Sequence, residues 1–451
     1  MRLEREYNMK VIIIGGIASG MSAAAKLRRV NPEAQVTIYE KAEYVSFGAC
    51  GLPYYVGDYF EDEKRMFART PEQVKSMGIS LHLKHEVLNV DTEKKIVVVK
   101  NLETGEEFED SYENLMVATG AKAVVPPIKN ISLDHIYFLR TLEDGHKVRE
   151  KLADPHIKKV GIIGAGFIGL EVAEAAHQQG KEVAVFQLED RVLPSVFDVE
   201  ITDIIEEELR SKGIQLYLNS AVKEFEGLEK VSKVITADEK VDVDLVIIAT
   251  GVRPNTSFLE DTGIHMLKNG AIVVDQQGKT SIPGIYAAGD CATVPHLLMK
   301  DVYIPLATSA NKLGRIVGEN IGGGHATYEG TLGSSCVKVL DIEAGRTGLT
   351  EREARNTGRN IKTVFVTDKN HTDYYPGQEK IHVKLIYDGD TFEILGGQTV
   401  GKSDAVLRSN VIATAITAKM TTKQLGMLDL CYSPPFARTW DVLNVAGNVA
   451  K

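Results

Sequence analysis

The stretch "KKVGIIGAGFIGLEVAEAAHQQG", residues 158–180, contains the pattern that decides the fold. An apolar run ends at Gly164, and Gly166 and Gly169 complete the spacing G-x-G-x-x-G before a helical pattern begins. The first glycine allows a tight turn, the second lets the backbone approach a pyrophosphate, and the third permits close helix–strand packing. Together with the strand-like "EVAVFQ" (182–187), the stretch predicts a βαβ unit that binds a dinucleotide. The residues expected to line its turn are Gly164, Gly166, Phe167, Ile168 and Gly169.

A second unit of the same kind opens the chain. The strand and helix pattern "MKVIIIGGIASGMSAAAKLRRV" (9–30) is followed by the strand "QVTIYEK" (35–41), although its middle glycine is displaced by one position. An acid stands at the end of the second strand, twenty residues after the last glycine, where it can accept hydrogen bonds from a ribose. The residues expected at this site are Gly15, Gly16, Ala18, Gly20 and Glu40.

The unit around Gly164 has Gln187 where the other unit has its acid. A glutamine can bond a ribose hydroxyl without repelling a 2′-phosphate, and no arginine stands at that place to attract one. The sequence therefore leaves both NADH and NADPH open as ligands, and Gln187 is expected to contact either.

Three further glycine turns follow predicted strands. "NLMVATG" (114–120) and "VDLVIIATGVRPN" (243–255) each end a strand with A-T-G, and "TSIPGIYAAGDCA" (280–292) ends one with G-D. Residues 321–330 are a plausible linker, and from about residue 331 the pattern becomes α+β without a nucleotide signature. The cofactor-binding candidates from these turns are Ala118, Thr119, Gly120, Gly251 and Asp290.

Composition excludes several classes of protein. A chain of 451 residues holds about two to four domains. Its net charge of −10 argues against nucleic-acid binding, and no apolar run approaches the length of about 18–20 residues that spans a membrane. Four scattered cysteines without a C-x-x-C pair, and the charged opening "MRLEREYN" in place of a secretory leader, predict a reduced, cytoplasmic protein.

The order of these parts resembles the pyridine nucleotide–disulfide oxidoreductase family from about residue 9 to the end. The resemblance implies an α/β fold, glutathione reductase-like, with two Rossmann-like dinucleotide-binding domains and a C-terminal α+β dimerisation domain. It also implies FAD in the first unit, NADH or NADPH in the second, a homodimer, and Asp290 bonded to the ribityl or phosphate portion of FAD. The expected domains are 9–150 with 255–325 for FAD, 151–254 for NAD(P)H, and 331–451 for dimerisation.

The stretch "SFGACGLPYYVG" (46–57) indicates which branch of this family the chain resembles. Cys50 has no second cysteine nearby, and S-F-x-x-C-G-L-P-Y-Y is similar to the single-cysteine branch of NADH oxidases, NADH peroxidases, coenzyme A-disulfide reductases and persulfide reductases. Ser46 matches that pattern and is expected to contact the substrate, whereas Ala49 stands where asparagine is frequent. Ala18 replaces the histidine of the oxidases and peroxidases, which disfavours oxygen or peroxide as the substrate.

Two C-terminal segments, "HTDYYPG" (371–377) and "LCYSPPF" (430–436), resemble those that send two tyrosines into the partner subunit's active site in coenzyme A-disulfide reductases. The matching residues are Tyr374 and Tyr432, with Tyr375 as an alternative to the first. A phenol beside the reacting sulfurs can protonate a departing thiolate. The resemblance therefore makes Cys50, Tyr374 and Tyr432 the catalytic candidates.

Coenzyme A carries phosphates, so a basic group is expected near the cysteine. "AKLRRVNP" (25–32) supplies Arg29 as the first candidate and Arg28 as the second, although cations at a helix C-terminus are also favoured by the helix macrodipole alone.

The predicted activity is the FAD-dependent, NAD(P)H-driven reduction of coenzyme A disulfide, with Cys50 held between turnovers as a mixed disulfide with coenzyme A. A coenzyme A-persulfide or polysulfide reductase is the nearest alternative, weakened by the lack of an appended sulfur-transfer domain. An NADH oxidase or peroxidase comes third. A flavin redox sensor that turns over slowly is the alternative that is not an enzyme. No metal is expected.

Overall fold

The computed structural model describes residues 9–300 and 302–451, so the charged opening lies outside the described residues. Contacts divide the chain into two compact units. The first contains residues up to 51, 62–124 and 252–331, and the second contains 52–61, 125–251 and 332–451. The expected three-domain boundaries stay a prediction. Within the described ranges, no helix combines the length and the apolar character that crossing a membrane requires.

The first unit is built on a five-stranded parallel sheet with the order β18-β7-β1-β2-β3. Its central strands are continuous apolar runs because both faces are covered. The strands are β1 (Lys10–Ile14), β2 (Gln35–Glu40), β3 (Ile79–Leu83), β7 (Asn114–Val117) and β18 (Ile285–Ala287).

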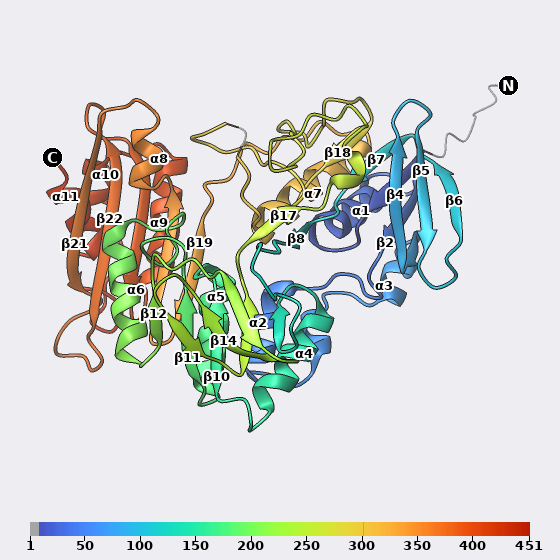
Figure 1. Cartoon of the computed structure of the whole chain (residues 1–451). Coiled ribbons are helices and arrows are strands. Elements are labelled where there is room, and N and C mark those ends of the chain that lie inside the picture. Colours follow the sequence, from blue (N-terminus) through green and yellow to red (C-terminus); the bar gives the residue numbers. More distant parts are fainter. Residues whose placement is uncertain (1–8, 301) are drawn as a thin grey trace. The chain divides into compact units, whose positions relative to one another are not determined.

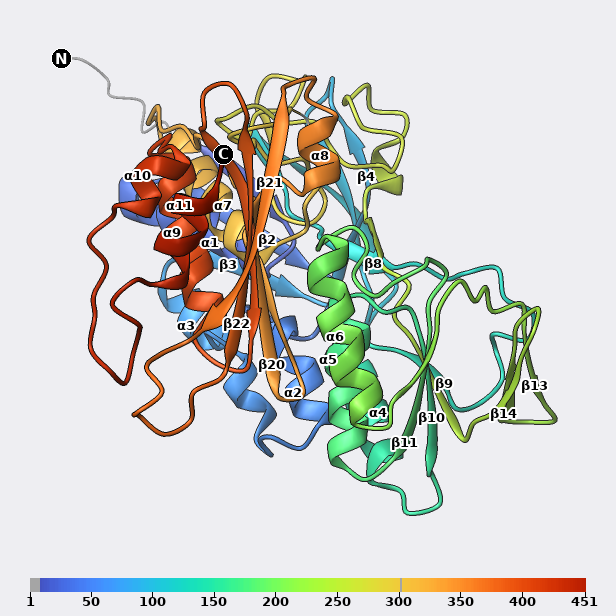
Figure 2. The ribbon, with the colours of Figure 1, turned by 90° about the vertical axis from the view of Figure 1, so that its left-hand side faces the viewer.

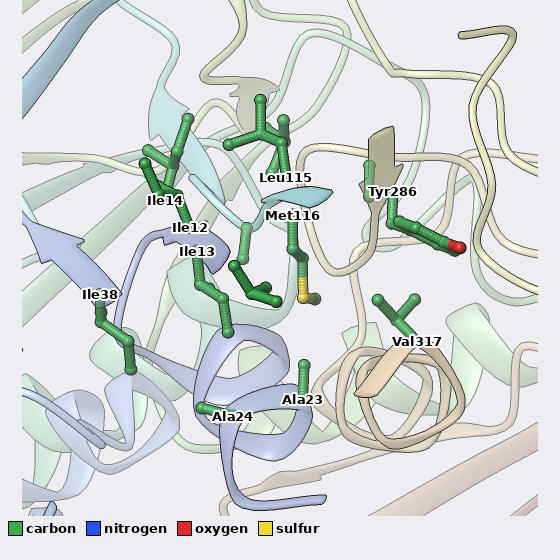
Figure 3. Close-up of a cluster of buried hydrophobic side chains, with 14 of the residues drawn as sticks. Ile12, Ile13, Ile14, Ala23, Ala24, Ile38, Leu115, Met116, Tyr286 and Val317 are labelled. Atoms are coloured by element: carbon green, nitrogen blue, oxygen red, sulfur yellow. The ribbon is translucent and has the colours of Figure 1, made fainter. Parts of the chain in front are cut away.

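Two helices, α1 (Ala18–Val30) and α7 (Ala307–Ile321), lie side by side against this sheet (Figure 1). Small residues allow the close approach, because a Cβ on Gly314 would lie 2.4 Å from the Ser19 carbonyl oxygen. Figure 3 shows part of the resulting core, where Ile13 of β1 points toward Ala23 and Ala24 of α1. This packing fixes the C-terminal ends of β1 and β2 relative to the start of α1.

Smaller elements complete the first unit. An antiparallel sheet contains β4 (His85–Asp91), β5 (Ile96–Asn101) and β6 (Glu107–Ser111), and a ribbon pairs β8 (Ala121–Ala123) with β17 (Val252–Pro254). The short helices are η1 (Ala49–Gly51), η2 (Glu63–Met66), α3 (Pro71–Ser76) and η3 (Ser257–Leu259).

The second unit repeats the parallel arrangement with the strand order β12-β11-β10-β16-β9. Its strands are β9 (Ile136–Phe138), β10 (Lys159–Ile163), β11 (Glu182–Phe186), β12 (Gln215–Tyr217) and β16 (Leu245–Ile248). The helices are α2 (Leu52–Val56), α4 (Leu142–Ala153), α5 (Phe167–Gln178) and α6 (Val199–Ser211), and a three-stranded sheet contains β13 (Glu224–Gly227), β14 (Val231–Ile235) and β15 (Lys240–Asp242).

The C-terminal part of the second unit is an antiparallel sheet with the order β19-β20-β23-β22-β21. Figure 2 shows α9, α10 and α11 on one side of it and α6 on the other. The strands are β19 (Ser335–Val339), β20 (Ile342–Gly348), β21 (Ile361–Lys369), β22 (Lys380–Asp388) and β23 (Ile394–Gly401); the helices are α8 (Glu351–Arg355), α9 (Ala405–Thr417), α10 (Thr422–Gly426) and α11 (Val442–Val449). The fold class predicted from the sequence is therefore confirmed.

A buried charge cluster joins the two parts of the second unit. Lys384 of β22 is 1% exposed and its Nζ lies 2.7 Å from carboxylate oxygens of Glu200 on α6 and of Glu351 on α8. Asp198 lies 3.4 Å from the same nitrogen and accepts a 2.7 Å hydrogen bond from Gln398. A buried cation is tolerated there because three carboxylates compensate it.

Candidate active site

The first glycine turn has the geometry expected of a dinucleotide site. Gly15 has φ +105°, and a Cβ there would lie 2.3 Å from the Ala118 carbonyl oxygen. A Cβ on Gly20 would lie 2.0 Å from the Gly15 oxygen, so both positions require glycine. Ile17, the N-cap of α1, offers its first turn no side-chain hydrogen bond. No side-chain cap therefore competes with a pyrophosphate for the N–H groups at this helix end.

Glu40 lies at the end of β2, beside this turn. Its carboxylate accepts hydrogen bonds from the Gly16 N–H at 2.7 Å and from the Ala42 N–H at 2.8 Å, and the residue is 6% exposed. Burial raises the pKa of Glu40, and the two backbone donors oppose that rise. Each carboxylate oxygen keeps a lone pair, so ribose hydroxyls can bond to a group already held in place.

The first A-T-G turn and the G-D turn both lie near the end of β1 and the start of α1 in the first unit. The Ala118 N–H donates to the Ile14 carbonyl oxygen at 2.8 Å, which places Ala118, Thr119 and Gly120 beside the end of β1. Ser19 of α1 donates its hydroxyl to the Ala288 oxygen at 2.9 Å, so the half-buried Asp290 is close to the start of α1. The structure thus brings these FAD-binding candidates together.

Among the described residues of the first unit, three buried hydroxyl oxygens have no hydrogen-bond partner, those of Ser46, Tyr112 and Ser309. Ser46 has φ +58°, and its N–H donates to the Gly16 oxygen at 2.9 Å, so it lies against the glycine turn. Ser309 lies in the first turn of α7 and was missed by the sequence reasoning, although "ATSA" after the G-D turn marks a helix start. A buried hydroxyl without a partner beside a glycine turn fits a site that a polar ligand occupies.

Cys50 lies in η1 of the first unit and is exposed. The loop before it is held by backbone bonds from the Gly48 N–H to the Met66 oxygen at 2.7 Å and from the Ala68 N–H to the Ser46 oxygen at 3.0 Å. A Cβ on Gly51 would lie 2.9 Å from the Met66 side chain. The thiol is therefore accessible but carried on a well-braced turn.

The second glycine turn repeats the first. Gly164 has φ +104° with a Cβ position 2.5 Å from the Ala249 oxygen, and a Cβ on Gly169 would lie 2.0 Å from the Gly164 oxygen. A Cβ on Gly166 or Gly251 would meet no atom within 4 Å, so open space lies in front of both. Phe167 and Ile168 begin α5, and Gly166 gives that helix no side-chain cap. These features fit the pyrophosphate of a nicotinamide dinucleotide.

Gln187 is placed as the sequence predicts, at the end of β11 beside this turn. Its Oε1 accepts a hydrogen bond from the Ala165 N–H at 2.8 Å, and its Nε2 donates to Glu189 at 2.6 Å. The sequence reasoning missed Glu189, which is exposed two residues further on.

The two tyrosine segments come together in the second unit. Tyr374 lies between β21 and β22, Tyr432 lies between α10 and α11, and their hydroxyl oxygens are 3.3 Å apart. The Thr372 hydroxyl donates to the Pro434 oxygen at 3.1 Å and ties the two loops to each other. The hydrogen bond to Tyr432 raises the pKa of Tyr374. Tyr375 instead packs edge-on against His371, with ring centroids 5.5 Å apart.

The two arginine candidates differ in their surroundings. Arg28 donates through Nε to the Met77 oxygen at 3.0 Å and through Nη1 to the Ala34 oxygen at 2.9 Å, which caps local carbonyl groups. Arg29 is exposed. The structure thus gives Arg28 a role within the first unit and leaves the Arg29 side chain facing solvent.

Glu171 is another group that the sequence reasoning missed. It lies on α5 two residues after Gly169, is hydrogen-bonded to Tyr54, and has its pKa raised to about 7 chiefly by burial. Its neighbour Glu174 accepts hydrogen bonds from the Tyr59 hydroxyl at 3.0 Å and the Leu340 N–H at 2.8 Å. No cluster of potential metal ligands occurs among the residues that the structure describes.

Two dinucleotide-binding βαβ units, an antiparallel sheet domain and an accessible thiol define the class of NAD(P)H-dependent flavoprotein oxidoreductases. Residues 9–314 match the model of the pyridine nucleotide-disulphide oxidoreductase family, and residues 334–442 match the model of its dimerisation domain. The chain belongs to this family, and the dimerisation domain supports a homodimer.

The chain is similar to several known proteins over nearly its whole length. A NAD(P)H coenzyme A polysulfide/persulfide reductase of Pyrococcus horikoshii is 39% identical over 98% of each chain. An NADH oxidase of Enterococcus faecalis is 35% identical over 98% of this chain and 99% of its own length. The structure of reduced CoADR-RHD of Bacillus anthracis superposes with a TM-score of 0.93 at 32% identity, covering 97% of this chain and 79% of that one.

Proposed function

We propose that this protein uses FAD and NAD(P)H to reduce the disulfide of coenzyme A, or a mixed disulfide of coenzyme A, through Cys50. The single observation that carries the proposal is the pair of exposed phenols, Tyr374 and Tyr432, with hydroxyl oxygens 3.3 Å apart. A paired phenol suits a reaction that expels a thiolate, because it can donate a proton to the departing sulfur.

Each of the two glycine turns is proposed to bind one cofactor. The first turn, with Glu40 and Asp290, would hold FAD, the second, with Gln187, would hold the nicotinamide cofactor, and Ser46 is proposed to contact the substrate. Bound FAD supplies the acceptance of hydride from NAD(P)H and the transfer of two electrons to a disulfide.

Cys50 is the proposed point of covalent chemistry. Its thiolate attacks one sulfur of coenzyme A disulfide, forms a mixed disulfide with one coenzyme A and expels the other as a thiolate. Tyr432, hydrogen-bonded to Tyr374, is proposed to protonate that thiolate from across the dimer. Two electrons then cleave the mixed disulfide, a second coenzyme A leaves, and the Cys50 thiolate is restored. Arg29 is proposed to attract the phosphates of coenzyme A, with Arg28 as the second candidate for that role.

A second candidate is the reduction of coenzyme A persulfide or polysulfide at the same cysteine. The similarity to the Pyrococcus horikoshii reductase over the whole chain favours it. The two candidates share the attack of Cys50 on a sulfur–sulfur bond and differ in what leaves, a thiolate of coenzyme A or a hydrosulfide.

Anaerobic steady-state kinetics test the proposal and separate the candidates. We expect NAD(P)H consumption with coenzyme A disulfide to exceed consumption with coenzyme A persulfide at matched concentrations, and Cys50→Ser to abolish both. A higher kcat/KM with the persulfide would establish the second candidate. In a parallel aerobic assay, NAD(P)H consumption that requires oxygen but neither substrate would overturn both candidates. Slow consumption with every acceptor would indicate a redox sensor.

A further inference from the structure

The two nucleotide-binding units hold equivalent side chains in equivalent places. In the first, the N–H that follows the leading glycine belongs to Gly16 and donates to the carboxylate of Glu40 at 2.7 Å. In the second, the corresponding N–H belongs to Ala165 and donates to the amide oxygen of Gln187 at 2.8 Å. Glu40 and Gln187 are each 6% exposed. Gln187 therefore occupies the place of the ribose-binding acid without carrying its charge.

The contacts of Gln187 fix the orientation of its amide. Oε1 must face the Ala165 N–H, which is a donor, so Nε2 faces the other way and donates to Glu189 Oε2 at 2.6 Å. The backbone around the pair is also braced, because the Gln187 oxygen accepts from the Ser220 N–H at 2.8 Å and the Glu189 oxygen accepts from the Asn219 N–H at 2.8 Å. The negative charge that Gln187 lacks thus stands beside it on Glu189.

The nearby cation, Arg191, is paired with Asp190 and not with Glu189. Arg191 lies two residues further on, and its Nη1 is 3.2 Å from Asp190 Oδ1 while its Nη2 donates to the Pro194 oxygen at 3.4 Å. Asp190 and Arg191 largely neutralise each other, so Glu189 sets the sign of the charge beside Gln187.

We propose that Glu189 is the residue that makes the second nucleotide site selective for NADH over NADPH, with Gln187 as its positioning residue. This inference rests on the proposed function, which assigns the nicotinamide cofactor to this turn. The Glu189 carboxylate accepts a hydrogen bond from the 2′-hydroxyl of the adenosine ribose. A 2′-phosphate, which carries about −1.5 to −2 charges near neutral pH, is repelled by the same carboxylate.

Equilibrium binding to the oxidised, FAD-loaded dimer tests the role without relying on turnover. The probes are ADP-ribose and 2′-phospho-ADP-ribose, measured by titration calorimetry. We expect the wild type to bind ADP-ribose at least about tenfold more tightly, and Glu189→Gln to lower that ratio about tenfold, mainly by tightening the phosphorylated probe. Glu182→Gln, the same charge change on an exposed residue at the opposite end of β11, should leave the ratio unchanged.

The possible outcomes distinguish a failure of the role of Glu189 from a failure of the nicotinamide site itself. Equal binding of the two probes by the wild type, or a ratio unchanged by Glu189→Gln, would overturn the role of Glu189 and leave the nicotinamide site in place. Failure of the wild type to bind either probe would overturn the nicotinamide site itself, and the role of Glu189 with it. Raised salt should narrow the ratio in the wild type more than in Glu189→Gln, because only the wild type uses charge repulsion.

Discussion

The hydroxyl oxygens of Tyr374 and Tyr432 lie 3.3 Å apart although 58 positions separate the two residues in the chain. Both side chains are exposed, and the loops that carry them are joined by the hydrogen bond from Thr372 to Pro434. The hydrogen bond to Tyr432 raises the pKa of Tyr374. Paired phenols on braced loops suit proton donation to a departing thiolate.

Removing either hydroxyl should therefore slow turnover. We expect Tyr432→Phe to lower kcat with coenzyme A disulfide by roughly 10²-fold, because general acid catalysis typically contributes at least that factor. Tyr374→Phe should also lower kcat. The double variant should lower kcat by a smaller factor than the product of the two single reductions. Tyr375→Phe is the matched control, since that ring packs on His371. Equal kcat for Tyr432→Phe and Tyr375→Phe would remove the proton-donor role.

The first glycine turn should tolerate no side chain. Gly15→Ala places a Cβ 2.3 Å from the Ala118 oxygen at φ +105°, so we expect the turn to shift and the purified protein to lose most of its flavin. Gly105→Ala is the control, because its φ of +76° is also positive but a Cβ there meets no atom within 4 Å. Flavin absorbance per mole of protein is the measurement. Full flavin content in Gly15→Ala would contradict FAD binding at this turn.

Lys384 should matter for stability far more than an exposed lysine. Lys384→Met leaves Glu200, Glu351 and Asp198 without their shared cation, which should lower the free energy of unfolding by about 3–5 kcal/mol. Lys402→Met, which removes an exposed 3.1 Å ion pair with Glu379, should cost about 1 kcal/mol or less. Denaturant unfolding of the FAD-loaded protein compares them. Similar losses for both variants would show that the buried cluster contributes little.

Glu171 should make stability depend on pH. Its pKa is raised to about 7 from an ordinary value of 4.5, so the folded protein keeps a proton that the unfolded chain has lost between those pH values. Stability should therefore fall as pH rises from about 4.5 to about 7, by at most roughly 3 kcal/mol. Glu171→Gln should flatten that part of the profile in thermal unfolding, whereas Glu182→Gln should not. A profile unchanged by Glu171→Gln would place its titration outside this range.

Much of the fold could be predicted because glycine turns leave a direct mark on the sequence. Gly15, Gly20, Gly164 and Gly169 stand where a Cβ would collide with backbone, so the folded geometry restricts which residue can occupy those positions. The meeting of the two tyrosine loops came instead from the resemblance to a family, since no local pattern reports a contact over 58 positions.

Other features depend on contacts that the sequence does not display. Arg28 looked like an anion-binding residue, but its partners are carbonyl groups, one of them at Met77. Glu189 could not be distinguished from any exposed acid until the amide of Gln187 was seen to face it. Lys384 interrupts an apolar strand, and its three carboxylate partners come from residues far away in the chain.

The most direct test of the central claim is the intact mass of the purified protein before and after treatment with a thiol reductant, followed by peptide mapping. The claim that Cys50 reacts with coenzyme A predicts a mass increment equal to one coenzyme A less two hydrogens, removed by reductant and mapped to Cys50. A Cys50 that carries a sulfenic acid and no thiol adduct, with turnover that consumes oxygen, would contradict it.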